Sequence, residues 1–359
     1  MLQLVALMIP ILDQFLGFFS YDLGVDLGTV NTLVNIRGKG IAIREPSIVA
    51  QHKKSRKVIA IGQEARKMLG RTPGGIAVIR PLHNGVISDY DTTLSLLSYF
   101  VKKVHEKPGK YFSIPRPRMV IGVCTLASEV ERRALLDVAY ASGARSAFLI
   151  EEPIAAAIGA ELPILDPVGS MIVDIGGGTC EIAVISLGGV VVGKCLKIAG
   201  DTMDMDIIRY VRSRYGLAIG EKTAEEIKIA LGNAYPTKLE KEMVIRGRDL
   251  EKGLPKSVRL SSVQVREALS QSISTIVAAI REAIEDAPPE LAADIAERGI
   301  VFCGGGSLIS GLPKLVSSET RMPVSVASEP LSCVAKGTCV ILENSEFLKK
   351  LKMNHQTFR

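Results

Sequence analysis

Two short segments of the sequence each place an acidic residue before a glycine turn and a threonine. Residues 24–29 read Gly-Val-Asp-Leu-Gly-Thr, and residues 32–36 after them look like a strand. Residues 173–179 read Val-Asp-Ile-Gly-Gly-Gly-Thr, and Cys180–Ser186 again looks like a strand. Glycine lets the backbone approach an anion closely, and successive N–H groups in such a turn can point at it. The pattern is typical of turns that bind phosphate.

The two copies predict a phosphate site with two sides. The phosphate-binding residues would be Gly28, Thr29 and Asn31 on one side, and Gly177, Gly178 and Thr179 on the other. Asp26 and Asp174 would end their strands facing the phosphates, where carboxylates need a cation between them and the phosphate oxygens. Mg²⁺ suits this place because it accepts one or two carboxylates and keeps waters. Either copy alone is equally explained as an ordinary hairpin, but the repetition favours a clamped ligand.

A third glycine turn, Gly304-Gly305-Gly306-Ser307, follows a strand-like run at residues 299–303 and precedes a helix. It has no acidic residue, so it suits a neutral part of a nucleotide. A plain connection between a strand and a helix explains it as well when it is taken alone.

The elements that would position these turns alternate between strand and helix, which predicts an α/β fold with helix-covered sheets. Ser128 and Glu131 form a capping box that begins a helix. A long helix is expected over residues 262–286, where apolar residues recur with the helical period until Pro288 and Pro289. The expected strands are Arg118–Val123, residues 147–150, Ser170–Ile175, Cys180–Ser186 and residues 189–198.

Composition indicates a folded protein of about two domains, since 47% of the 359 residues are hydrophobic and 23% are charged. The net charge of +6 is spread along the chain, which argues against a nucleic-acid partner because such proteins concentrate their basic residues. The six cysteines form no CxxC pair and no cluster with histidine, so buried reduced thiols are expected.

The segment from Met1 to Ser20 is apolar and contains no Lys or Arg. Pro10 and Asp13 interrupt it, so a helix lying in a membrane interface fits better than a spanning helix. The alternative is an N-terminal extension that packs on the body of the protein.

The three glycine turns resemble, in order, the first phosphate, second phosphate and adenosine motifs of the actin, sugar-kinase and DnaK-type chaperone superfamily. The closer resemblance is to the MreB family of bacterial actins, and it covers the chain from Asp22 to about Lys350. It is carried by residues 26–34, 79–81, 129–134, 150–159, 219–225 and 334–337.

This resemblance implies an actin-like ATPase fold, in which two duplicated α/β domains of four subdomains surround a central nucleotide cleft. Domain I is expected over residues 21–165 and 331–350, and domain II over residues 166–330. The implied activity is slow, Mg²⁺-dependent hydrolysis of ATP to ADP. The implied nucleotide-binding residues are Gly28, Thr29, Val30, Asn31, Gly176, Gly177, Gly178, Thr179, Glu225, Lys228, Gly304, Gly305, Gly306 and Ser307, with Asp26 and Asp174 at the metal.

By the same resemblance Glu152 would position the attacking water and Thr179 would help to orient it. From the residues alone, Glu152 is better explained as an acid at a helix N-terminus, since Pro153 suits the first helical turn. Glu225 and Lys228 could likewise be a solvated helix pair that contributes about 0.2–0.5 kcal/mol.

The resemblance also implies contact surfaces. Family members insert an apolar pair into the bilayer at the position of Tyr111 and Phe112, and basic neighbours there would add attraction to anionic lipid. Val130 corresponds to a position where paired protofilaments meet, although an ordinary core valine is the alternative. The implied partners are further copies of the chain, the inner face of the cytoplasmic membrane, a bitopic membrane anchor and other shape-determining proteins.

The expected function is therefore a cytoplasmic, membrane-associated filament protein that organises cell-wall synthesis and cell shape. A small-molecule kinase of the same superfamily would need an acceptor pocket with a further general base, and no candidate is evident. A chaperone-type ATPase would need a peptide-binding domain, for which little chain remains. Cys180, Cys124 and Met205 depart from the family pattern, and Cys180 puts the role of a second hydroxyl in question.

Overall fold

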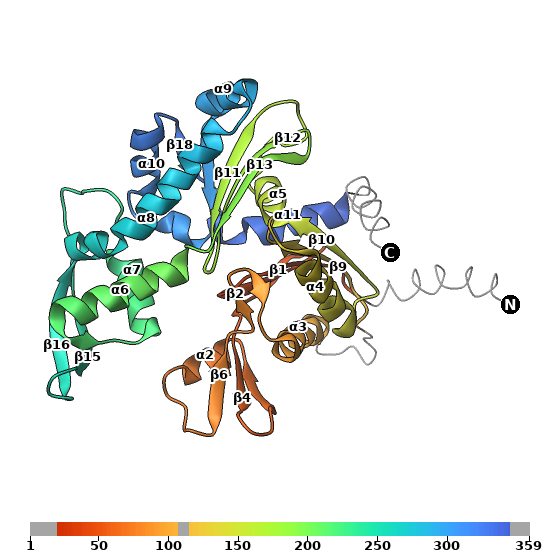
Figure 1. The fold of residues 1–359 in the computed structure, drawn as a ribbon. Helices are drawn as coiled ribbons and strands as arrows, with labels where there is room; N and C mark the ends of the chain where they lie inside the picture. The colour runs from red at the N-terminus through yellow and green to blue at the C-terminus, as the bar shows by residue number, and fades with distance from the viewer. Residues whose placement is uncertain (1–19, 107–114, 345–359) are drawn as a thin grey trace. The chain divides into compact units, whose positions relative to one another are not determined.

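The computed structural model describes residues 20–106 and 115–344, in which strands and helices alternate as the sequence predicts (Figure 1). The chain divides into two compact units. Unit 1 contains the residues up to Glu161 together with those from Ser332 onward, and unit 2 is Leu162–Leu331. Each unit contains one five-stranded sheet and one separate three-stranded sheet.

The large sheet of unit 1 has the strand order β10-β9-β1-β2-β3. Strands β1, β2 and β3 form an antiparallel meander, and β9 and β10 run parallel to β1. The central strands are almost wholly apolar and buried, as expected for strands covered on both faces. Their bounds are Leu23–Leu27 (β1), Asn31–Ile36 (β2), Gly40–Pro46 (β3), Arg118–Val123 (β9) and Ser146–Glu151 (β10).

The large sheet of unit 2 repeats this topology, with the order β13-β12-β11-β17-β18. Here β11, β12 and β13 are the antiparallel meander, and β17 and β18 run parallel to β11. The internal duplication predicted from the two glycine turns is thus confirmed, since each turn joins the first two strands of its sheet. The bounds are Ser170–Ile175 (β11), Cys180–Ser186 (β12), Gly189–Leu196 (β13), Ile300–Cys303 (β17) and Val324–Val326 (β18).

The smaller sheets are built from segments inserted after each meander. Unit 1 inserts β4 (Val49–His52), β5 (Val58–Ile61) and β6 (Ile76–Ile79), followed by the short pair β7 (Leu82–His83) and β8 (Val86–Ile87). Unit 2 inserts β14 (Leu217–Ala218), β15 (Glu242–Asp249) and β16 (Pro255–Ser261).

Helices complete both units. Those of unit 1 are α2 (Gln63–Met68), α3 (Tyr90–His105), α4 (Glu129–Ala141), α5 (Glu152–Gly159) and α11 (Cys333–Glu343). Those of unit 2 are α6 (Gly200–Tyr215), α7 (Glu221–Leu231), α8 (Ser262–Glu285), α9 (Pro289–Arg298) and α10 (Leu312–Thr320). Two 3₁₀ turns are η1 (Gly305–Leu308) and η2 (Pro330–Ser332).

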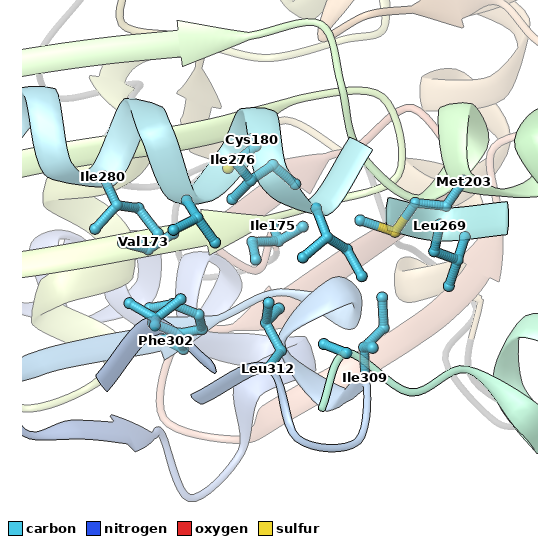
Figure 2. Packing of buried hydrophobic residues seen from close by; sticks show 14 of the residues in the cluster. Val173, Ile175, Cys180, Met203, Leu269, Ile276, Ile280, Phe302, Ile309 and Leu312 are labelled. Carbon is cyan, nitrogen blue, oxygen red and sulfur yellow. The ribbon is translucent and has the colours of Figure 1, made fainter. Parts of the chain in front are cut away.

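Helix α8 forms much of the core of unit 2. Its predicted apolar stripe is buried from Val265 to Ile280, and Figure 2 shows Ile276 and Ile280 against β11. The helix begins at a capping box of Ser261 and Gln264, and it ends at Glu285, three residues before Pro288. The apolar stripe therefore packs α8 against the large sheet of unit 2, whose strands β11 and β12 are joined by the second glycine turn.

Residues 1–19 of the predicted membrane-associating segment Met1–Ser20, and the pair Tyr111 and Phe112, lie outside the described residues. Ser20 itself is buried, with its hydroxyl 3.0 Å from His105 Nε2. Within the part of the chain that is described, no helix is long and apolar enough to cross a bilayer.

Candidate functional site

The first glycine turn joins β1 to β2 at the edge of the sheet in unit 1. Asp26 is half-buried near the end of β1, directly opposite Leu33. A Cβ on Gly28 would lie 2.7 Å from the carbonyl oxygen of Asn31, so the turn is too tight for a side chain there. Ser47 holds the turn from outside by donating to the Gly28 carbonyl over 2.6 Å.

Thr29 and its neighbours are fixed by backbone groups. The Thr29 side chain is buried, and the N–H of Gly85 donates to its Oγ1 over 3.0 Å. The Ser47 N–H donates to the Val30 carbonyl over 2.9 Å, whereas Asn31 is exposed. The Thr29 hydroxyl still carries its own hydrogen, which can be donated to an anion.

Glu152 begins helix α5 immediately after β10. Because β1, β9 and β10 are parallel, their carboxyl ends lie at one edge of the sheet, and Asp26 and Glu152 share that edge. A Cβ on Gly122 of β9 would lie 3.1 Å from Glu152 Cγ, so the Glu152 side chain extends over β9. The neighbouring Glu151 is 3.6 Å from Arg132.

The second glycine turn, in unit 2, is held by the start of α6. The N–H of Gly200 donates to the Gly176 carbonyl over 3.2 Å, and the N–H of Asp201 donates to the Gly177 carbonyl over 2.8 Å. In a planar trans peptide the N–H points opposite to the preceding C=O. The N–H groups of Gly177 and Gly178 therefore point away from α6, and successive N–H groups of this kind can bind an anion.

The third glycine turn packs against the end of β11. Cys303, just before this turn, lies opposite Asp174 in the parallel pair of β17 and β11. Gly304 has φ of +76°, and a Cβ there would lie 2.3 Å from Asp174 Oδ1. A Cβ on Gly306 would lie 2.2 Å from Ile175 Cγ2. Gly304 and Gly306 are thus required by the close approach of the third turn to the end of β11, where the second glycine turn begins.

Asp174 is a carboxyl group in an environment that disfavours its charge. Burial raises its pKa to about 6, and a hydrogen bond with Cys303 opposes this only in part. A bound cation would offset the cost of burying the carboxylate. The Ser307 hydroxyl stabilises the third turn internally, because it donates to the Gly304 carbonyl over 2.6 Å. Gly305 is exposed.

Lys228 is not part of a solvated helix pair. Its side chain is only 15% exposed, and its Nζ lies 2.9 Å from Asp204 Oδ1 on α6. The same Nζ donates to the Gly200 carbonyl over 2.8 Å, at the start of α6. Glu225, half-buried one turn earlier on α7, lies close enough to raise the pKa of Asp204.

Cys180 points into the hydrophobic core and not toward the glycine turn (Figure 2). It lies opposite Ile175, and burial raises the pKa of its thiol. A hydroxyl in its place would face the same core, so the departure leaves the turn intact. Cys124 is also buried, just after β9.

Several residues of these sites were not predicted from the sequence. Ser47 and Gly85 come from the segments inserted after β2 and are brought to the first turn only by folding. Glu181 is buried directly opposite Asp174 on β12, which the alternation of a strand could have predicted. Asp204 is the last residue of the segment Gly-Asp-Thr-Met-Asp at 200–204, directly before the exposed Met205.

Val130, on helix α4, is 78% exposed, which excludes a core role for it. The helix begins at the predicted capping box of Ser128 and Glu131. Val130 therefore presents an apolar side chain to solvent in the first turn of a well-anchored helix.

Comparison with known proteins gives consistent results. Residues 20–350 match the protein-family model described as MreB/Mbl protein. The cell shape-determining protein MreB of Escherichia coli (strain K12) is 50% identical over 336 residues, covering 92% of this chain and 96% of that protein. The structure of MreB 5 of Spiroplasma citri bound to AMPPNP is 37% identical, with a TM-score of 0.85 over 94% of this chain and 99% of that one. The MamK double helical filament is 26% identical, with a TM-score of 0.76 over 90% of this chain and 99% of that one.

Proposed function

The chain belongs to the MreB/Mbl family, and on this premise we propose that it is an ATP-dependent filament protein that determines cell shape. It would bind ATP with Mg²⁺, hydrolyse it slowly to ADP, and assemble on the inner face of the cytoplasmic membrane. The filaments would organise the machinery of cell-wall synthesis.

The observation that carries this proposal is the anchored turn of unit 2. The first amides of α6 donate to the carbonyls of Gly176 and Gly177, which leaves the N–H groups of Gly177 and Gly178 directed away from α6 and suited to bind an anion. Asp174 and the close-packed Gly304 turn border the same strand end. A phosphate with its cation on one side and a neutral nucleoside on the other suits this combination.

Unit 1 contains residues of the same kinds, which we propose also bind phosphate. The Thr29 hydroxyl, held by Gly85, can donate to a phosphate oxygen, and the backbone of Gly28, Val30 and Asn31 would contribute as well. The Asp26 carboxylate lies at the corresponding strand end. These groups repeat the acid, turn and hydroxyl of unit 2.

Glu152 and Thr179 are the proposed catalytic residues. Phosphoryl transfer needs mostly positioning and charge neutralisation, with one group that orients the attacking water. Glu152 is half-buried at the start of α5, fixed by Pro153 and by close contact with β9. Thr179 is buried at the end of the second glycine turn, where its hydroxyl would assist.

The donor set fits Mg²⁺. Asp26 and Asp174 are carboxylates at equivalent strand ends, and burial makes the charge of Asp174 costly unless a cation compensates it. When bound, the ion would neutralise charge that develops on the phosphates. Glu225 and Lys228 on α7, together with Gly304, Gly305, Gly306 and Ser307, would border the nucleoside.

Self-assembly is supported by the MamK double helical filament, which shares this fold. The exposed Val130 is a suitable contact between paired protofilaments, since an apolar side chain in solvent gains by burial. Membrane attachment would use residues 1–20 with Tyr111 and Phe112, and a bitopic anchor and other shape-determining proteins would be further partners.

The test is nucleotide dependence of assembly in solution. Purified protein with ATP and Mg²⁺ should scatter light and release phosphate, whereas protein without nucleotide should do neither. Transfer of phosphate from ATP to an added sugar, without polymer, would instead establish a small-molecule kinase. Release of a bound unfolded peptide by ATP would indicate a chaperone-type ATPase.

A further inference from the structure

Asp204 is a nearly buried carboxylate near the start of α6 that the proposed mechanism leaves without a role. The residue is 9% exposed, and its Oδ1 lies 2.9 Å from Lys228 Nζ on α7. The two side chains are 12% and 15% exposed, so solvent and salt screen this ion pair much less than a surface pair.

Lys228 connects this carboxylate to the backbone of the second glycine turn. Its Nζ also donates to the Gly200 carbonyl over 2.8 Å, and the N–H of Gly200 donates to the Gly176 carbonyl. A continuous series of contacts thus runs from Asp204 through Lys228 and Gly200 to Gly176.

Helix α6 depends on this arrangement at its N-terminus. Its N-cap is Ala199, which supplies no side-chain cap, so the turn carbonyls satisfy the first helical amides. A Cβ on Gly200 would lie 3.2 Å from Lys228 Nζ and 3.5 Å from Gly177 Cα. The ammonium group is therefore packed directly behind the turn.

The charges around Asp204 require a cation in this place. Asp201 and Glu225 both raise the pKa of Asp204, in addition to the larger effect of burial, and Lys228 lowers it. The positive charge of Lys228 thus offsets the negative charge of carboxylates on both α6 and α7. Lys228 is in contact with Asp204.

We infer that Asp204 is a positioning residue for the second glycine turn, and that it acts through Lys228. The carboxylate selects one conformation of the flexible lysine side chain, which keeps the Gly200 peptide and the Gly176 and Gly177 carbonyls in place. The ligand of the turn, a nucleotide phosphate, rests on the proposed function. The mechanical link from Asp204 to the turn does not.

The experiment measures two properties of Asp204→Asn, Lys228→Met and the double variant. The first is amide hydrogen exchange at Gly176, Gly200 and Asp201, whose N–H groups donate hydrogen bonds within the turn and from α6 to it, in nucleotide-free protein. The second is the dissociation constant for ATP. We expect exchange about tenfold faster in each single variant and ATP binding about tenfold weaker in Asp204→Asn, because a charge-assisted contact is lost. Lys228→Met is judged by exchange, because Lys228 is itself proposed to border the nucleoside. The double variant should be no worse than the more impaired single variant.

The matched control is Glu240→Gln, which breaks an ion pair of similar exposure with Arg266, 3.0 Å away, and does not touch the turn. It should leave both properties at wild-type values. Asp204→Glu, which keeps the charge, should restore part of the loss, and thermal unfolding of each variant identifies any that fails to fold.

Wild-type exchange at Gly176, Gly200 and Asp201 in folded Asp204→Asn would overturn the inference, as would additive effects in the double variant. Failure of the wild-type protein to bind ATP would refute the proposed function instead. In that case the exchange measurement alone still decides the link between Asp204 and the turn.

Discussion

At the scale of single residues, a substitution of Glu152 should separate the hydrolysis of ATP from its binding. Its carboxylate begins α5 and extends over β9, while the proposed phosphate contacts come from other residues. Glu152→Gln keeps the shape and removes the charge. It should therefore bind ATP normally and release phosphate about a hundredfold more slowly, as measured in a steady-state phosphate assay.

The adjacent Glu151→Gln is the control, because that carboxylate lies near Arg132 and has no proposed catalytic role. It should hydrolyse ATP at close to the wild-type rate. An unchanged rate in Glu152→Gln would show that Glu152 is only a helix N-terminal acid.

The raised pKa of Asp174 leads to a prediction of how cation binding depends on pH. Its pKa of about 6 exceeds the ordinary value of 3.8, so the folded protein binds this proton more tightly than the unfolded chain. Without a cation, the free energy of unfolding should thus fall as pH rises from about 4 to about 6. A divalent cation needs the ionised carboxylate, so its affinity should fall about tenfold per pH unit below pH 6.

Titration of the protein with Mn²⁺ at pH 7.5 and pH 5 measures this effect. Asp174→Asn should bind weakly at both pH values and lose most of the difference between them. The same pH dependence in the wild type and the variant would show that Asp174 is not a ligand.

At the scale of elements, the third glycine turn predicts a contrast between neighbouring residues. Gly304→Ala places a Cβ 2.3 Å from Asp174 Oδ1 at a positive φ, whereas a Cβ on Gly305 meets only Leu331 Cδ2 at 3.5 Å. Gly304→Ala should lower the free energy of unfolding by about 1–3 kcal/mol and weaken ATP binding. Gly305→Ala should do neither.

Thermal unfolding and ATP titration of the two variants make the comparison. Equal behaviour of Gly304→Ala and Gly305→Ala would mean that the turn can move away from β11, and that its close packing is not required.

Much of the element structure follows from local sequence patterns. The sequence predicts a strand over Arg118–Val123, and the structure has a strand with the same bounds. The α8 stripe and the Ser128 capping box also depend on neighbours within one or two helical turns. Periodicity and capping are local, so one sequence suffices to find them.

The contacts that hold the turns are not local, which is why they escaped prediction. Ser47 reaches Gly28 from β3's end, and Lys228 reaches Gly200 across 28 residues. Asp204 on α6 likewise meets Lys228 on α7 only through the packing of the two helices. The burial of Cys180 was expected, but its direction toward the core depends on which face of β12 meets that core.

At the scale of the whole molecule, the exposed side chain of Val130 leads to a prediction about how protofilaments pair. Because the side chain is 78% exposed, Val130→Glu should change the free energy of unfolding by no more than about 0.5 kcal/mol. A buried carboxylate at a paired surface would be costly, so electron microscopy should show single protofilaments with ATP. Leu187→Glu, at a 69% exposed position in unit 2, is the control and should keep the pairs.

Paired filaments in Val130→Glu would place the lateral contact elsewhere on the molecule. Loss of all polymer in that variant would indicate that α4 contributes to contacts along a protofilament.

The most direct test of the central claim is sedimentation of the full-length protein with anionic liposomes, with and without ATP and Mg²⁺, followed by electron microscopy of the pellet. The proposed function predicts filaments on the lipid surface in ATP and Mg²⁺, and little pelleted protein without nucleotide. Protein that stays in the supernatant as a monomer under every condition would contradict it.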